Sequence, residues 1–146
     1  MNERHKNIFI ISILLIGILL CQGLFVNSAS ASEVDTAKAV IHHTASGDVS
    51  AATIDEWHKA RGWDGIGYHF IIRASGKVEK GRSITKKGAH AKGRNHWVGI
   101  ALTGYDTFTM AQIDALKKLL SRLRITKIER HHENCPGPGI DMDSLL

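Results

Sequence analysis

A single cysteine, Cys135, lies outside the apolar stretch with which the chain begins, and this limits how the chain can be stabilised. The other cysteine, Cys21, lies inside that stretch, which has the pattern of a removable export signal. A lone thiol in an exported domain cannot form an internal disulfide. The folded part therefore has to rely on one hydrophobic core, and Cys135 needs another explanation.

Residues 1–31 predict a cleaved signal peptide. Arg4 and Lys6 precede an almost wholly apolar run, 8–20, and Ala29-Ser30-Ala31 is a small-residue cleavage pattern. An uncleaved membrane anchor is the alternative. A spanning helix needs about 20 mostly apolar residues, and polar residues and glycines interrupt this one. We expect export, to the periplasm or to the extracellular space.

Cleavage after Ala31 leaves 115 of the 146 residues, which we expect to form a single domain, 32–146. Two basic residues and one acidic residue are removed, so 19 and 14 become 17 and 13, a net charge of +4 with neutral histidines. Such a mild charge suits an anionic surface such as a cell wall. It is too weak and too scattered to indicate nucleic acid. We expect a monomer with no nucleic-acid partner.

Hydrophobic patterns predict strands and helices that alternate around one hairpin. The predicted strands span residues 38–43, 68–73, 77–80, 97–102 and 125–130. Capping-box spacing predicts two helix starts, at Thr53–Glu56 and at Thr109–Gln112. The second helix carries an apolar stripe that we assign to the core: Ile113, Leu116, Leu119, Leu120 and Leu123. This order predicts an α/β fold, a single domain with a central mixed β-sheet flanked by helices. The Gly-rich segment 81–95 is predicted to be a long loop, and such loops tend to be functional.

Histidines end two of the predicted strands. His42 and His43 close the first strand, and His131 follows the last one, four residues before Cys135. Ligands gather at the C-terminal ends of strands in α/β sheets, so these side chains can meet across neighbouring strands. Imidazole and thiolate are zinc ligands, and three of them leave a fourth tetrahedral position for water. The sequence therefore predicts a hydrolytic Zn²⁺ site.

Several motifs occur in a specific order between residues 40 and 141. They are Val40–Ala45, Trp57-His58, Gly67–Ile72, Gly88–His96, Val98–Leu102 and His131–Gly137. Together they resemble the zinc-dependent N-acetylmuramoyl-L-alanine amidases of the phage-lysozyme and peptidoglycan-recognition-protein type. The resemblance implies a mixed sheet with a zinc groove on one face. It also implies the substrate, which is the peptidoglycan amide between N-acetylmuramic acid and the first L-alanine of the stem peptide.

The same resemblance implies roles for individual residues. The metal ligands are expected to be His42, His131 and Cys135, and Tyr68 is expected to line the catalytic site. One departure from the family concerns the stretch between His131 and Cys135, which in family members is usually longer and often supplies a lysine or threonine that assists catalysis. Neither residue is present here, so no assisting residue is carried over.

Several assignments have alternatives. Tyr68 is either an oxyanion donor or a packed strand aromatic, and His132 competes with His131 as a ligand. Glu133 is a candidate proton shuttle, or else a solvated acid or a partner to a ligand imidazole. His90 either contacts substrate or caps a turn, and His43 is a candidate substrate-binding residue or an ordinary strand-end neighbour.

Three further aromatic residues are assigned to the scaffold. His69 alternates to the opposite face from Tyr68 and is expected to be structural. Trp57 and Trp63 are expected to pack in the core or at the rim rather than to bind sugar.

Two rival functions remain. The first is a non-catalytic peptidoglycan-binding module, which the presence of Cys135 disfavours because such members of the family typically lack the ligand cysteine. The second is a cytoplasmic amidase for wall recycling, which the export signal disfavours.

Overall fold

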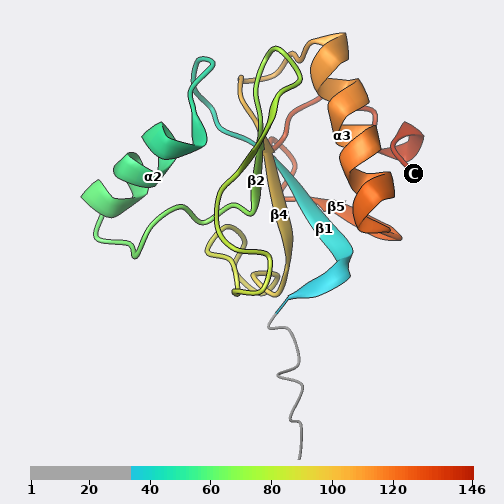
Figure 1. Ribbon diagram of the computed structural model, residues 1–146. Coiled ribbons are helices and arrows are strands. Elements are labelled where there is room, and N and C mark those ends of the chain that lie inside the picture. Colours follow the sequence, from blue (N-terminus) through green and yellow to red (C-terminus); the bar gives the residue numbers. More distant parts are fainter. Residues whose placement is uncertain (1–33) are drawn as a thin grey trace, which may run out of the picture. The chain divides into compact units, whose positions relative to one another are not determined.

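Five strands form one mixed sheet in residues 34–146, the part of the chain that the computed structural model describes (Figure 1). The strands are β1 (Asp35–His43), β2 (Phe70–Ile72), β3 (Val78–Lys80), β4 (Trp97–Leu102) and β5 (Lys127–Arg130). Their order across the sheet is β3-β2-β4-β1-β5. Only the β2–β3 hairpin is antiparallel among these pairs. The mixed sheet is therefore confirmed, whereas the predicted signal peptide lies outside the described residues.

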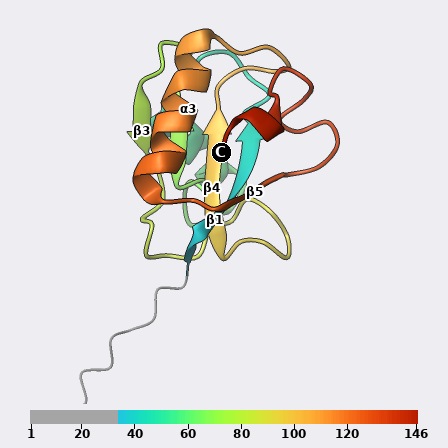
Figure 2. The same ribbon diagram turned by 90° about the vertical axis from the view of Figure 1, so that its right-hand side faces the viewer.

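Helices cover the two faces of the sheet. On one face lies α3 (Met110–Leu123) (Figures 1 and 2). Its residues Leu116, Leu119 and Leu120 belong to the main hydrophobic cluster. On the other face, α2 (Ala51–Ala60) contributes to a smaller cluster. All six residues of β4 are buried, as expected for a parallel strand covered on both sides. No helix within residues 34–146 has the length and apolar character needed to cross a bilayer.

The alternation of β1 decides which face of the sheet carries His42. Ile41 belongs to the cluster under α3. Successive side chains of a strand point to opposite faces, so His42 faces the α2 side of the sheet. Tyr68, just before β2, packs against the cluster on the same side. The fold therefore separates the larger core from the face that carries the site.

The start of α3 agrees with the sequence-based prediction, whereas the start of α2 does not. Thr109 and Gln112 form the expected capping box. The N-cap of α2 is Ser50, whose hydroxyl accepts from the Thr53 amide at 3.1 Å. The predicted capping box at Thr53–Glu56 is therefore wrong, and the helix begins one turn earlier.

Replacing Thr109 with alanine is expected to lower the free energy of unfolding by about 1–2 kcal/mol. Its hydroxyl accepts from the Gln112 amide and also donates to the carbonyl of Ala74 at 2.7 Å. Urea denaturation measures the loss. Ser121→Ala, at an exposed position of the same helix, is the control and is expected to change stability by less than about 0.5 kcal/mol. Equal losses in the two variants would contradict the assigned cap.

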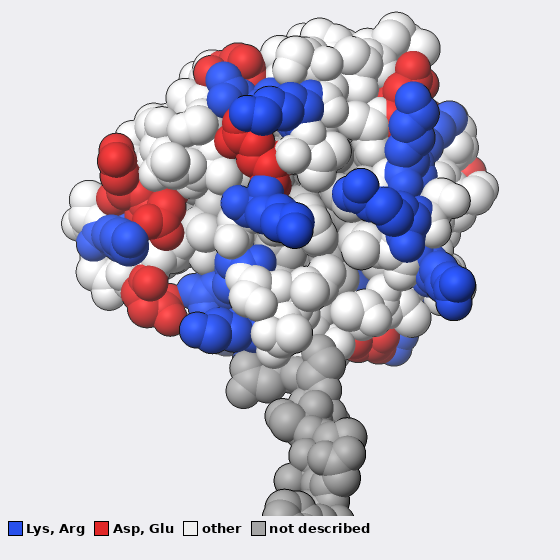
Figure 3. All heavy atoms as spheres, in the orientation of Figure 1, with Lys and Arg blue, Asp and Glu red and all other residues white. Residues whose placement is uncertain are grey.

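Charged side chains are mixed rather than segregated on the face shown in Figure 3. Ion pairs among residues 34–146 include Arg82 with Asp64 at 2.6 Å and Arg94 with Glu129 at 2.9 Å. The mild positive charge is therefore not gathered into one patch on this face.

Candidate metal centre

The three predicted ligands meet at one edge of the sheet. His42 lies near the end of β1, and His131 directly follows β5. The two strands are parallel neighbours, with Ile41 paired to Arg130, so their C-terminal ends lie together. One potential ligand atom from each of His42, His131 and Cys135 lies within 4.8 Å of the other two. Two strand-end imidazoles and a thiol therefore converge, as the sequence predicted.

A tight turn brings the sulfur back to the sheet. His132 and Cys135 exchange two backbone hydrogen bonds, with N–O distances of 3.0 and 3.3 Å. The turn buries the Cys135 side chain to 4% exposure and places its Sγ 3.9 Å from Nδ1 of His42. The amide of His43 also donates to this sulfur, at 3.5 Å. A separation of only four residues is therefore enough to supply both an imidazole and a sulfur.

The donor set fits zinc in both chemistry and spacing. Zinc–nitrogen bonds of about 2.0–2.1 Å and a zinc–sulfur bond of about 2.3 Å imply a nitrogen–sulfur separation of about 3.6 Å in a tetrahedron. The 3.9 Å between His42 Nδ1 and Cys135 Sγ is close to that value. His131 belongs to this group, whereas His132 is exposed on the turn. The geometry thus favours His131 over its neighbour as the ligand.

Burial also sets the protonation of these groups. It lowers the pKa of His42 well below the ordinary histidine value, helped by the nearby His90 and His131, and it lowers the pKa of His131. Both imidazoles are therefore neutral at pH 7, the form that binds a metal. Burial raises the pKa of the Cys135 thiol, although the amide of His43 opposes this shift. The thiolate therefore needs a nearby cation to form.

Tyr68 lies next to the ligand group. The centroids of its ring and of the His42 ring are 5.1 Å apart. Burial, together with the nearby Cys135, raises the pKa of Tyr68 to about 12. The phenol therefore stays protonated over the physiological range and can act as a hydrogen-bond donor beside the metal position.

His90 contacts His42, one of the predicted ligands, directly. Its Nδ1 lies 3.0 Å from Nε2 of His42, and its Nε2 lies 3.1 Å from the backbone oxygen of Trp97. The sequence did not predict this contact, because 48 residues separate the two histidines. His90 also lines a hollow of about 380 Å³ together with Trp63 and Lys92. It therefore touches both the ligand group and a space that could hold substrate.

The loop around His90 also supports His131, the second predicted ligand. Arg94 donates to the backbone oxygens of Arg130 and His131, at 2.8 and 2.6 Å. These bonds fix the backbone from which the His131 imidazole projects. The long loop predicted from the sequence is confirmed, and it holds the chain at the end of β5.

Two further predicted site residues lie at the margin of the centre. The ring of His43 donates from Nδ1 to the backbone oxygen of Tyr105, so it links the end of β1 to the following loop. Glu133 is exposed on the turn that precedes Cys135. The predicted roles of His43 in substrate binding and of Glu133 in proton transfer stay predictions.

Trp57 and Trp63 line two hollows next to the predicted metal centre. Trp57 and Trp63 are 40% and 44% exposed, so the structure places them at the rim and not in the core. A hollow of about 140 Å³ is lined by Trp57, Arg61 and Tyr68, among others. His69, by contrast, is buried and accepts from the amide of Gly99 at 2.8 Å, which confirms a structural role. Trp57 thus lies beside Tyr68, and Trp63 lies beside His90 in the other hollow.

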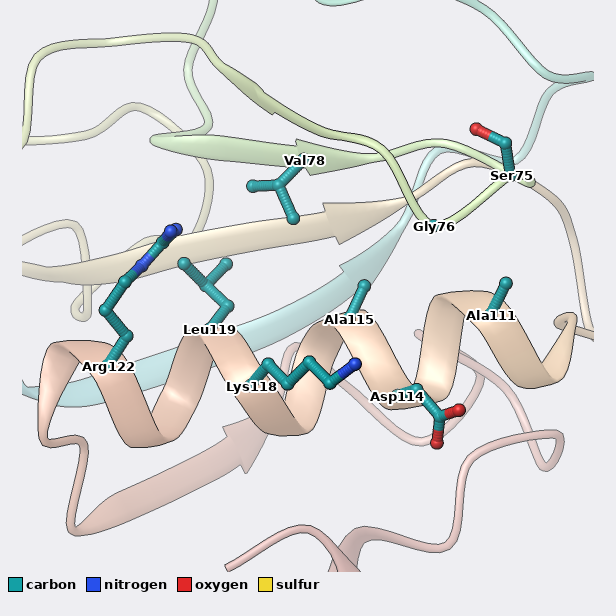
Figure 4. A pocket seen from close by; sticks show the side chains of 9 residues that line it. All are labelled: Ser75, Gly76, Val78, Ala111, Asp114, Ala115, Lys118, Leu119 and Arg122. Carbon is teal, nitrogen blue, oxygen red and sulfur yellow. The ribbon is translucent and has the colours of Figure 1, made fainter.

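A hollow on the α3 side is unrelated to this centre. It has a volume of about 510 Å³ and lies between α3 and the β2–β3 hairpin (Figure 4). Its wall is formed by Val78, Ala115 and Leu119, and Lys118 and Arg122 lie at its edge. None of the predicted site residues lines it.

Acid should destabilise the metal-free protein through the buried imidazoles. The unfolded chain has histidine pKa values near 6.5, whereas burial lowers the folded-state pKa of His90 to about 4 and that of His42 well below 6.5. Between about pH 5 and 6.5 the unfolded state therefore binds more protons. The free energy of unfolding should fall with decreasing pH by up to about 1.4 kcal/mol per unit and per group. Urea denaturation in EDTA measures this slope, which should be shallower in His90→Asn. A stability that does not change across this window would contradict the assignment.

Comparisons with known proteins agree with this geometry. The family model described as N-acetylmuramoyl-L-alanine amidase matches residues 33–138. The endolysin of Escherichia phage T7 is 42% identical over 111 residues, which cover 65% of this chain and 73% of the endolysin. Peptidoglycan-recognition protein SC2 of Drosophila melanogaster is 42% identical over 96 residues, 57% of this chain and 52% of that protein. The solved structure of the amidase LysC from Clostridium intestinale has a TM-score of 0.70 and 34% identity, and the match covers 79% of this chain and 85% of LysC.

Proposed function

The chain belongs to the N-acetylmuramoyl-L-alanine amidase family and hydrolyses peptidoglycan, and we propose that it does so as an exported, monomeric zinc enzyme. His42, His131 and Cys135 would hold the metal. The observation that carries this proposal is the convergence of their three ligand atoms within 4.8 Å. The bond hydrolysed is the amide between N-acetylmuramic acid and the L-alanine of the stem peptide.

The metal and the side chain of Tyr68 would have different tasks in the hydrolysis of the amide. Zinc in such a site supplies a Lewis acid that polarises the amide carbonyl and activates water near neutral pH. Tyr68, protonated and beside His42, would donate a hydrogen bond to the carbonyl oxygen as negative charge develops there. No lysine or threonine between His131 and Cys135 is present to share this task. Tyr68 would therefore carry a large share of the stabilisation by the protein.

Substrate would bind across the α2 side of the sheet. The two hollows with Trp57 and Trp63 at their rims border Tyr68 and His90. A glycan with its peptide is long and polar, so a shallow surface with aromatic and basic rim residues suits it. The scissile amide would then lie over His42.

Digestion of purified sacculi tests this function. The enzyme should release stem peptides that begin with a free L-alanine amine, and mass spectrometry would identify them. EDTA should stop the release, and added zinc should restore it. Binding to sacculi without release of peptide would instead support a recognition module. Export predicts that the secreted protein begins at Ser32, which N-terminal sequencing would show.

A further inference from the structure

The two ring nitrogens of His42 have different neighbours. Nδ1 faces the sulfur of Cys135 at 3.9 Å, and Nε2 faces Nδ1 of His90 at 3.0 Å. A metal-ligating nitrogen must offer a lone pair, so a neutral His42 that binds through Nδ1 carries its hydrogen on Nε2. In this tautomer, His42 can only donate to His90.

The backbone carbonyl of Trp97 fixes the tautomer of His90, and this tautomer is the one that can accept a hydrogen bond from His42. Nε2 of His90 lies 3.1 Å from the oxygen of Trp97, and a carbonyl oxygen can only accept. His90 therefore carries its hydrogen on Nε2 and presents a lone pair at Nδ1. Two hydrogen bonds then run in one direction, from His42 to His90 and from His90 to the backbone of β4. In these two hydrogen bonds, each ring nitrogen therefore donates or accepts as its partner requires.

The fold keeps a place for the His90 ring. A Cβ added to Gly88 or to Gly99 would collide with that ring, so both glycines leave the space that it occupies. The side-chain oxygen of Asn95 accepts from the amides of His90 and Ala91, at 2.7 and 2.8 Å. Gly99 and Trp97 belong to the central strand β4. The two glycines thus leave room for the ring, and Asn95 holds the backbone that carries it.

We propose that His90 is a positioning residue that fixes the tautomer and the ring orientation of His42 for metal binding. This inference rests on the proposed function, because it takes His42 as a ligand. It assigns His90 a role that differs from the substrate contact predicted from the sequence. Metal-ligating histidines commonly donate their other N–H group to an acceptor, and loss of that acceptor costs about 10–100-fold in metal affinity or activity.

Two substitutions test the two hydrogen bonds of His90 one at a time, because each keeps one bond and removes the other. In His90→Asn, the side-chain oxygen lies where Nδ1 was and can accept from His42, while the bond to Trp97 is lost. In His90→Gln, the amide lies near the former Nε2 and can reach Trp97, while the acceptor for His42 is lost. We expect H90Q to bind zinc about 10–100-fold more weakly than wild type and H90N to stay within about threefold. Competition with a chelator measures these affinities on the purified protein.

Thermal unfolding of the same variants without zinc separates positioning from simple structural support, because weaker zinc binding would itself lower the stability of zinc-loaded H90Q. H90N leaves the buried Trp97 oxygen without its donor, so H90N should be the less stable variant although it binds zinc better. A purely structural role predicts that zinc affinity follows stability. Proton-detected ¹⁵N spectra of the zinc-loaded wild type should show hydrogens on Nε2 of both His42 and His90.

The outcomes distinguish this inference from the proposed function. Zinc bound by the wild type, with H90Q binding zinc as tightly as H90N, would overturn the inference alone. A hydrogen on Nδ1 of His90 would also overturn it. A wild-type protein that holds no zinc would overturn the proposed function and this inference with it.

Discussion

Replacing Cys135 with serine is expected to remove zinc from the protein and to reduce amidase activity by more than about 100-fold. Loss of a residue that only supports a ligand costs about 10–100-fold, so loss of the ligand itself should cost more. Serine has a similar size, but its hydroxyl is a far weaker zinc ligand than a thiolate. Zinc content by mass spectrometry and peptide release from sacculi measure the two effects.

A matched control is available on the same turn. Asn134 is exposed and precedes Cys135, so Asn134→Ser makes a comparable change without touching the ligand group. It should keep both zinc and activity within about threefold of wild type, as expected for a surface substitution. Full zinc content in Cys135→Ser would show that the sulfur is not a ligand.

Replacing Tyr68 with phenylalanine is expected to lower the turnover number by about 10²- to 10³-fold, the usual cost of losing one donor to a developing oxyanion. The change removes a hydroxyl and keeps the ring that packs beside His42. Zinc content and substrate affinity should therefore change little. Steady-state kinetics on a soluble muropeptide, with metal analysis of the same samples, measures this separation.

Tyr105 provides the matched control for this change. It is 59% exposed, and only its backbone oxygen is engaged by His43, so Tyr105→Phe should leave turnover unchanged. Loss of zinc from Tyr68→Phe would place the hydroxyl in the scaffold of the metal site. A turnover number near that of wild type would remove Tyr68 from the chemistry.

The sheet and the convergence of His42, His131 and Cys135 could be predicted from the sequence. The strands follow from the hydrophobic pattern, and the convergence follows because the C-terminal ends of parallel strands meet at one edge of a sheet. The continuous apolar run 97–102 identified the central strand, and the histidines were placed at strand ends. Parallel pairing of β1 with its neighbours then brings those ends together. The short stretch between His131 and Cys135 raised the question of which histidine binds metal, and the tight turn favours the first.

The errors arose where contacts distant in sequence decide the outcome. Thr53–Glu56 has the spacing of a capping box, but Ser50 caps α2 one turn earlier, and the carboxylate of Glu79 also accepts from the amide of Ala51, the first residue of the helix, at 2.8 Å. That contact joins residues 28 positions apart. The bond between His42 and His90 could not be predicted for the same reason, since it depends on two glycines that make room for the ring. The sequence left open whether Trp57 and Trp63 lie in the core or at the rim, and their exposure places them at the rim.

X-ray absorption at the zinc edge of the purified protein tests whether His42, His131 and Cys135 hold zinc. We expect one bound zinc with a single sulfur neighbour at about 2.3 Å and two imidazole nitrogens at about 2.0–2.1 Å. The sulfur signal should disappear in Cys135→Ser and remain in Asn134→Ser. A zinc ion surrounded only by nitrogen and oxygen, or a protein without zinc, would contradict the account.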